Sequence, residues 1–248
     1  TCLTISRAAT DKKKILVAKG SYHGSAPWCT PVAIGVVEED TSNLIFFEYN
    51  DLSSLEEAAQ EAGNNLAGII LTAFRHDVRR DQELPKKTFL QKARDICDSK
   101  NAFLILDDVR AGFRLNRNGS WFDYGIKPDL TAFSKAIGNG YPLSAVVGTE
   151  KLRKAASEIY VTGSFWCNAT SMAASLKTLS IMEERDVVAH ISGLGNKLRS
   201  GIDQIASNYG VDISQSGPSQ MPMVLFKDDK DFAKGSKFVQ YLLNKGVY

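Results

Sequence analysis

The sequence predicts an α/β fold, in which helices cover an open and mostly parallel central sheet. Two patterns carry this prediction: short continuous runs of branched apolar residues, and longer amphipathic segments between them. Continuous apolar runs, unlike alternating ones, are typical of strands buried on both faces. Strand and helix patterns that alternate along a chain indicate parallel strands joined by helical crossovers. A change of pattern near Glu184 predicts a large domain over residues 1–184 and part of a smaller α+β domain over residues 185–248.

The expected strands of the large domain occur in order along the chain. They are residues 15–18, 32–37, 44–47, 67–71, 103–106, 129–133 and 144–147. A helix is expected from Leu52 until Gly63 stops it, because acidic residues in its first turns suit the positive end of a helix. A second helix is expected from Thr88, where five residues share one apolar face that should cover the sheet: Phe89, Leu90, Ala93, Ile96 and Cys97.

The pattern becomes more helical after about Thr170. A long helix with one apolar face is expected there, formed by Met172, Ala173, Leu176, Leu179 and Met182. Helical patterning continues to about Tyr209, and residues 211–213 and 223–226 are then expected to form strands of a different layer.

Composition and charge narrow the possible functions. The 248 residues are 44% hydrophobic and 23% charged, which is ordinary for a globular protein, and the formal net charge is only +2. No apolar run approaches the ~20 residues of a membrane-spanning helix, and no basic arm is present, so we expect neither a membrane nor a nucleic-acid partner. The four cysteines are scattered, which favours free thiols in the cytoplasm and predicts no metal site.

Candidate catalytic groups follow two of the expected strands. Residues 103–106 lead directly into Asp107 and Asp108, and residues 129–133 lead into Ser134 and Lys135, followed by the glycine-rich loop 138–142. In open parallel sheets the ligand lies beyond the carboxyl ends of the strands. The 28 residues from Asp107 to Lys135 (135 − 107) suit neighbouring strands joined by a crossover. An acid and a lysine are therefore expected in one crevice.

Two kinds of chemistry fit an acid pair at a strand end. A nucleotide hydrolase holds magnesium there, but it also needs a GxxxxGK[ST] phosphate loop, which this sequence lacks. The other is pyridoxal 5'-phosphate (PLP) chemistry, in which a lysine amine forms a Schiff base and a carboxylate keeps the pyridine nitrogen protonated. A turn-capping Asp107 and a solvated Lys135 would be the alternative without function.

Four segments together resemble the class III PLP-dependent aminotransferases, including enzymes like glutamate-1-semialdehyde aminomutase. The segment LILDDVRAGFR over residues 104–114 is similar to the family signature LIxDEVxxGFR, and residues 128–142 resemble the segment of the Schiff-base lysine. Residues 21–24 resemble the YHG element, and residues 162–168 stand where the family carries GTxSGN. The resemblance covers nearly the whole chain and implies the fold of type I PLP-dependent transferases.

The resemblance implies a role for each matching residue. Lys135 would hold PLP as an internal aldimine and act as the catalytic acid and base, and Asp107 would pair with the pyridine nitrogen. Val109 would contact one face of the cofactor ring, and Tyr22 would stack on the other. His23 belongs to the same element as Tyr22 and is included among the cofactor-binding residues.

The resemblance also implies a homodimer with shared active sites. Ser164, which replaces the usual threonine, would donate a hydrogen bond to the cofactor phosphate of the neighbouring subunit. Asp108 replaces a glutamate of the family. The phosphate-binding turn that should precede Thr1 is absent, as is the end of the small domain, so we expect an incomplete chain.

The expected activity is that of a transaminase acting on an amine or amino acid and a keto or aldehyde acceptor. The alternatives are a PLP-dependent aminomutase or racemase of the same fold, or a truncated scaffold subunit without catalytic activity.

Overall fold

The computed structural model describes residues 1–30, 32–76 and 80–248. The chain divides into two compact units. The first contains Thr1–Arg75 and Pro85–Val187, and the second contains His76–Leu84 and Val188–Tyr248. The boundary expected near residue 184 assigns all earlier residues to one domain, whereas the structure groups residues 76–84 with the C-terminal part of the chain.

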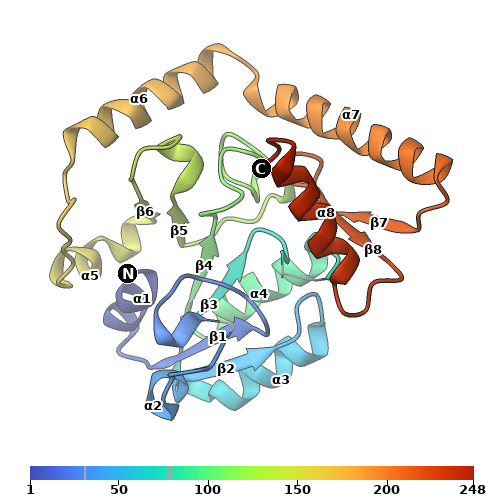
Figure 1. The fold of residues 1–248 in the computed structure, drawn as a ribbon. Coiled ribbons are helices and arrows are strands. Elements are labelled where there is room, and N and C mark those ends of the chain that lie inside the picture. The colour runs from blue at the N-terminus through green and yellow to red at the C-terminus, as the bar shows by residue number, and fades with distance from the viewer. Residues whose placement is uncertain (31, 77–79) are drawn as a thin grey trace. The chain divides into compact units, whose positions relative to one another are not determined.

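The first unit is built on a six-stranded sheet, drawn in Figure 1. Its strands are β1 (Lys14–Ala18), β2 (Leu44–Phe47), β3 (Leu66–Thr72), β4 (Phe103–Asp107), β5 (Leu130–Phe133) and β6 (Ala145–Gly148). Their order across the sheet is β2-β1-β3-β4-β5-β6. All neighbours pair in parallel except β5 and β6, which are antiparallel. The mostly parallel sheet predicted from the apolar runs is confirmed.

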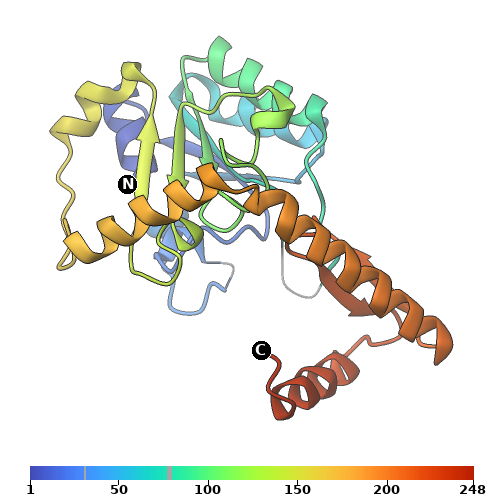
Figure 2. The same cartoon turned by 90° about the horizontal axis from the view of Figure 1, so that it is seen from above.

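The first unit contains six α-helices among its described residues: α1 (Cys2–Thr10), α2 (Glu38–Thr41), α3 (Leu52–Ala62), α4 (Lys87–Ser99), α5 (Arg153–Glu158) and α6 (Ala169–Glu184). Of these, α1, α3 and α4 pack against the sheet. Side chains of α1 pack with Ile15 and Val17 of β1, and α3 and α4 lie side by side elsewhere on the sheet (Figures 1 and 2). The expected apolar face of α4 is confirmed, since its five residues are all buried.

The end of α3 is marked by Gly63 as expected, but its start is capped by Asp51, and no acidic residue lies in its first turn. The Asp51 carboxylate accepts a hydrogen bond from the Ser54 amide at 3.0 Å, which satisfies a free donor of the first turn. Gly63 follows the helix with φ of 57°, a conformation that glycine adopts without a steric penalty. The helix therefore begins and ends where its sequence directs.

The strand expected over residues 32–37 is wrong. The amide of Val36 donates to the Ala33 carbonyl at 3.1 Å, and Gly35 has φ of 80°, so the segment turns instead of extending. Ile34 is 92% exposed. The apolar run resembles a buried strand in composition, but the turn at Gly35 prevents strand geometry.

The helix α6 forms as expected, but its apolar face is not buried. Leu176 is 71% exposed, whereas Ser171 and Ser175 are the buried residues of this helix. The second unit contains α7 (Val187–Asn208), β7 (Ile213–Ser216), β8 (Met223–Phe226) and α8 (Ala233–Asn244), with β7 and β8 antiparallel. Among the described residues, no helix combines the length and the apolar character needed to cross a membrane.

Candidate active site

The carboxylate of Asp107 lies at the carboxyl end of β4, near the middle of the sheet. In register, Asp107 faces Thr72 of β3 on one side and Ala132 of β5 on the other. The next residues leave the strand, so the side chain stands at the edge where ligands of parallel sheets bind. The Val109 amide donates to Asp107 Oδ1 at 3.2 Å, which fixes one carboxylate oxygen.

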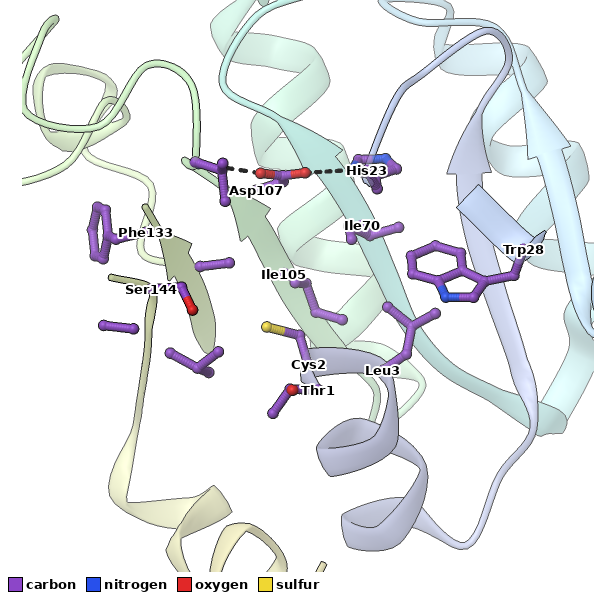
Figure 3. Close-up of a pocket in the computed structure, with 14 residues that line it drawn as sticks. Thr1, Cys2, Leu3, His23, Trp28, Ile70, Ile105, Asp107, Phe133 and Ser144 are labelled. Carbon is purple, nitrogen blue, oxygen red and sulfur yellow. Dashed lines mark hydrogen bonds and ion pairs between the residues drawn. The ribbon is translucent and has the colours of Figure 1, made fainter. Parts of the chain in front are cut away.

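The other oxygen of Asp107 contacts the imidazole of His23. His23 Nδ1 lies 2.8 Å from Asp107 Oδ2, and both side chains are largely buried, with 1% and 12% exposed (Figure 3). An ionised carboxylate can only accept, so Nδ1 carries the shared hydrogen. The opposite nitrogen, Nε2, is buried and has no partner among the described residues. The structure therefore joins His23 and Asp107, which lie far apart in the sequence.

A cavity of about 210 Å³ opens beside this pair. Its lining includes His23, Asp107 and Val109, together with Ile70 of β3 and Ile105 of β4, which face each other in register. Residues 1–3, at the start of α1, close another side of the cavity, as Figure 3 shows. The cavity thus combines a carboxylate with apolar walls.

The two adjacent carboxylates face opposite sides of the chain. Asp108 is fully buried and accepts from the Ser120 hydroxyl at 2.5 Å and from the Ser120 amide at 2.9 Å. Burial raises the pKa of Asp108, and the two bonds from Ser120 oppose the rise. Because Asp108 bonds to Ser120, it acts as an internal anchor of the turn after β4, while Asp107 faces the cavity.

Lys135 lies just beyond the adjacent strand. It begins the 3₁₀ turn η4 (Lys135–Ile137), three residues after Ala132, the register partner of Asp107. Its side chain is exposed and is not among the described residues that line the cavity. Its backbone has φ of 49°, in the left-handed region that few residues other than glycine adopt.

The turn that follows Lys135 is tightly closed. Amides of Gly138 and Asn139 donate to the Lys135 carbonyl at 3.1 and 3.0 Å. A Cβ atom at Gly138 would lie 2.3 Å from the carbonyl oxygen of Tyr141, so only glycine fits there. The Ser134 hydroxyl donates to the Leu143 carbonyl at 2.8 Å and ties the two ends of the loop together.

Two other expected site residues lie on the surface of this chain. Tyr22 is 50% exposed and precedes His23, but it does not line the cavity. Ser164 is also exposed, in a turn that the Trp166 amide closes by donating to the Gly163 carbonyl at 3.0 Å. The structure therefore brings His23, Asp107 and Val109 to one cavity, and leaves Tyr22, Lys135 and Ser164 outside its lining.

Trp28 and Cys2 are among the cavity residues that sequence reasoning missed. Trp28 lines it and stacks on the His23 ring, although Trp28 belongs to none of the matched motifs. Cys2 lines it from α1, and burial raises the pKa of this thiol to about 11, so it is neutral at pH 7. The position of Trp28, five residues after His23, was the one sequence signal for its role.

Comparisons with known proteins agree on one family. The sequence model of the class III aminotransferases matches residues 2–248. The aminopentol aminotransferase of Sphingopyxis macrogoltabida is 42% identical over 248 residues, covering 100% of this chain and 59% of its own length. The glutamate-1-semialdehyde 2,1-aminomutase of Sulfurihydrogenibium azorense is 32% identical, covering 99% of this chain and 63% of its own length.

A solved structure gives the same result. The FumI protein of Sphingopyxis sp. MTA144, in its PLP internal aldimine form, superposes with a TM-score of 0.97 at 42% identity. The match covers 100% of this chain and 60% of that chain. An omega-transaminase from Sphaerobacter thermophilus shares the fold at 22% identity, with a TM-score of 0.85 over 100% of this chain and 64% of that one. This chain thus spans about 60% of the length of these relatives.

Proposed function

Because the chain belongs to the class III aminotransferase family, with the fold of type I PLP-dependent transferases, we propose that the complete protein is a PLP-dependent aminotransferase. It transfers an amino group between an amine or amino acid and a keto or aldehyde acceptor. The observation that carries this proposal is the Asp107 carboxylate, which faces the cavity at the carboxyl end of β4 and is held by two donors.

The residues of the cavity fit PLP. An ionised carboxylate offers about four lone-pair sites, and His23 and Val109 use only two on Asp107, so a pyridinium N–H can still be accepted. Ile70 and Ile105 supply apolar walls for a flat ring. When bound, PLP supplies an electron-accepting ring that takes up the electron pair released at the substrate α-carbon.

Asp107 sets the charge at the ring nitrogen. The negative charge of this carboxylate would favour the protonated form of the ring nitrogen that it faces. Val109, whose side chain also lines the cavity, would contact one face of the ring. Tyr22, which is 50% exposed in this chain, would stack on the other face.

Lys135 would hold the cofactor covalently through Nζ until the substrate amine displaces it. The freed amine would then take the proton from the substrate α-carbon and return it to the cofactor, as general base and general acid. The left-handed backbone of Lys135 supports this role, because strained residues persist where the surrounding structure enforces them and cluster at functional sites.

We also propose a homodimer in which Ser164 reaches the cofactor phosphate of the partner subunit. Ser164 is exposed in this chain and adjoins two large exposed aromatic residues, Phe165 at 75% and Trp166 at 63%. Exposed apolar groups of this size favour burial against another protein surface. The exposed Leu176 of α6 adds to the apolar surface that a second copy would cover.

Two further features support finer parts of the proposal. The chain is 42% identical to an aminopentol aminotransferase but 32% identical to an aminomutase, which favours transfer of the amino group between two molecules over its transfer within one. Aminopentol is therefore a donor to test. All four cysteines are free thiols, three buried and one exposed, which favours the cytoplasm.

The proposal is tested by locating the lysine that holds PLP. The complete protein, loaded with PLP, is reduced with borohydride, digested and mapped by mass spectrometry. We expect one phosphopyridoxyl group, on Lys135, and no label in Lys135→Ala, which should stay folded by circular dichroism but lose transamination. The nearby Lys127 and Lys151 serve as internal controls. A label on either of these, or full transamination by Lys135→Ala, would contradict the assignment.

A further inference from the structure

Trp28 contacts the imidazole that holds Asp107. The indole and the His23 ring are stacked, with centroids 6.2 Å apart and planes 15° from parallel (Figure 3). This distance lies within the range of attractive aromatic pairs, about 4.5–7 Å. The imidazole of His23 therefore lies between Trp28 and the carboxylate of Asp107.

The loop between the two rings is closed by its own backbone. The Cys29 amide donates to the Ala26 carbonyl at 2.9 Å and forms the single turn η1 (Pro27–Cys29). The His23 amide in turn donates to the Cys29 carbonyl at 3.4 Å. These two bonds return the chain to His23, so that the side chain of Trp28 stands beside the imidazole.

Trp28 itself is anchored on the core. It packs against the cluster of buried apolar residues that includes Leu3 of α1, Ile70 of β3 and Ile105 of β4. These elements all belong to the first unit. The indole is therefore a fixed surface against which the smaller His23 ring rests.

The His23 ring has few other restraints. Nδ1 bonds to Asp107, but Nε2 has no partner among the described residues, so no hydrogen bond holds the far edge of the ring. The bond to Asp107 determines which edge of the imidazole faces the carboxylate. The stacking contact with Trp28 is a restraint on the plane of the ring.

We propose that Trp28 is a positioning residue, which holds the plane of the His23 ring so that Nδ1–H stays aligned with Asp107. The inference rests on the proposed function, in which Asp107 faces the ring nitrogen of the cofactor. A tilted imidazole donates poorly, and an Asp107 that has lost this donor can turn away from the cofactor nitrogen. The effect should therefore appear in turnover more than in substrate binding.

A double-mutant cycle on the complete PLP-loaded enzyme tests whether Trp28 acts through His23. We expect Trp28→Leu to lower kcat about 10-fold, the size typical for groups that orient an active-site ligand, with KM nearly unchanged. Trp28→Phe keeps an aromatic face and should retain most of kcat. In a His23→Phe background the further loss caused by Trp28→Leu should vanish, because the two residues act as one unit. Independent, multiplicative losses of kcat would overturn the proposal.

Ile159→Ala is the matched control, because Ile159 packs against the same cluster but is not among the described residues that line the cavity. It should lower stability while leaving kcat close to the wild-type value. A kcat loss in Ile159→Ala equal to that in Trp28→Leu would show that loosened core packing is the cause, and would refute positioning. If Trp28→Leu fails to fold, Trp28→Met takes its place in the cycle.

A second measurement needs no cofactor. In ¹⁵N-histidine-labelled cofactor-free protein, the Nδ1–H proton of His23 is assigned by its loss in His23→Phe. We expect its exchange with water to become at least about 10-fold faster in Trp28→Leu, and to stay slow in Trp28→Phe and Ile159→Ala. An unchanged exchange rate in Trp28→Leu, or no such proton in the wild type, would overturn the inference. Failure of the proposed function would show separately, as a wild-type protein that does not retain PLP.

Discussion

The substitution Ser120→Ala is expected to destabilise the protein to a degree that depends on pH. The carboxylate of Asp108 is fully buried, and Ser120 supplies two donors to it: the hydroxyl at 2.5 Å and the amide at 2.9 Å. Alanine removes the hydroxyl and leaves the amide in place. Asp108 would then keep a single donor in a site that water does not reach.

The size of the effect follows from the charge of the acceptor. A hydrogen bond to a charged group contributes about 1.5–3 kcal/mol, so we expect the free energy of unfolding to fall by about 2 kcal/mol at neutral pH. Burial already raises the pKa of Asp108 above that of an ordinary aspartate, and the hydroxyl of Ser120 opposes that rise. Its loss therefore raises the pKa of Asp108 further.

The direction of the pH dependence follows from proton linkage. A carboxyl whose pKa is raised on folding binds its proton more tightly in the folded state, so its contribution to stability declines as pH rises from the unfolded pKa through the folded pKa. The decline extends to higher pH in Ser120→Ala, because its folded pKa is higher. The variant and the wild type should thus differ least in acid, where Asp108 is protonated in both, and most at neutral pH.

Urea unfolding of the complete protein between pH 4 and pH 8, followed by circular dichroism, measures this difference. Ser6→Ala is the control, because Ser6 is equally buried but its hydroxyl has no partner among the described residues. We expect Ser6→Ala to change the unfolding free energy by less than about 0.5 kcal/mol at any pH. A loss in Ser120→Ala that is the same at every pH, or no larger than in Ser6→Ala, would refute the reasoning.

Three further substitutions test the site. Asp107→Asn keeps size but discards charge, so turnover of the PLP-loaded enzyme should fall about 100-fold while the urea midpoint stays close to wild type; near-native turnover would exclude the assigned role. Ser164→Ala should weaken PLP retention in dialysis more than it shifts the sedimentation coefficient, and an active monomer would contradict the shared site. Gly138→Ala places a Cβ against the Tyr141 carbonyl and should lower the free energy of unfolding by about 1–3 kcal/mol. It should also slow the borohydride labelling of Lys135. An unchanged labelling rate would show that the turn does not orient the lysine.

Much of the first unit could be predicted because its local and tertiary signals agree. The apolar runs at β3 and β4 form strands that pair with each other inside the sheet, where both faces are covered. The apolar face of α4 is buried, as the spacing of its residues indicates. The segment 32–37 has the same composition but turns at Gly35, which composition alone does not reveal. The face of α6 is exposed because the described residues of this chain do not cover it.

The candidate site shows the same limit. The sequence could place Asp107 and Lys135 at or just beyond the ends of neighbouring strands, because that placement depends only on the parallel pairing of the two strands. The contact of His23 with Asp107 depends on how the loop after β1 folds back over the sheet, and no periodicity encodes that path. Trp28 was missed for the same reason, because its contact with His23 arises from a loop closed by backbone hydrogen bonds.

The grouping of residues 76–84 with the C-terminal part of the chain bears on how chimaeric enzymes can be built from this family. The Gln82 amide donates to the Ser216 hydroxyl at 2.8 Å, and the Ser214 hydroxyl donates to Asp81 at 2.8 Å. A recombination site at Val187 alone would pair Asp81 and Gln82 of one parent with β7 of another. A chimaera that preserves these contacts would instead take residues 76–84 and 188–248 from the same parent, because the two segments form one compact unit.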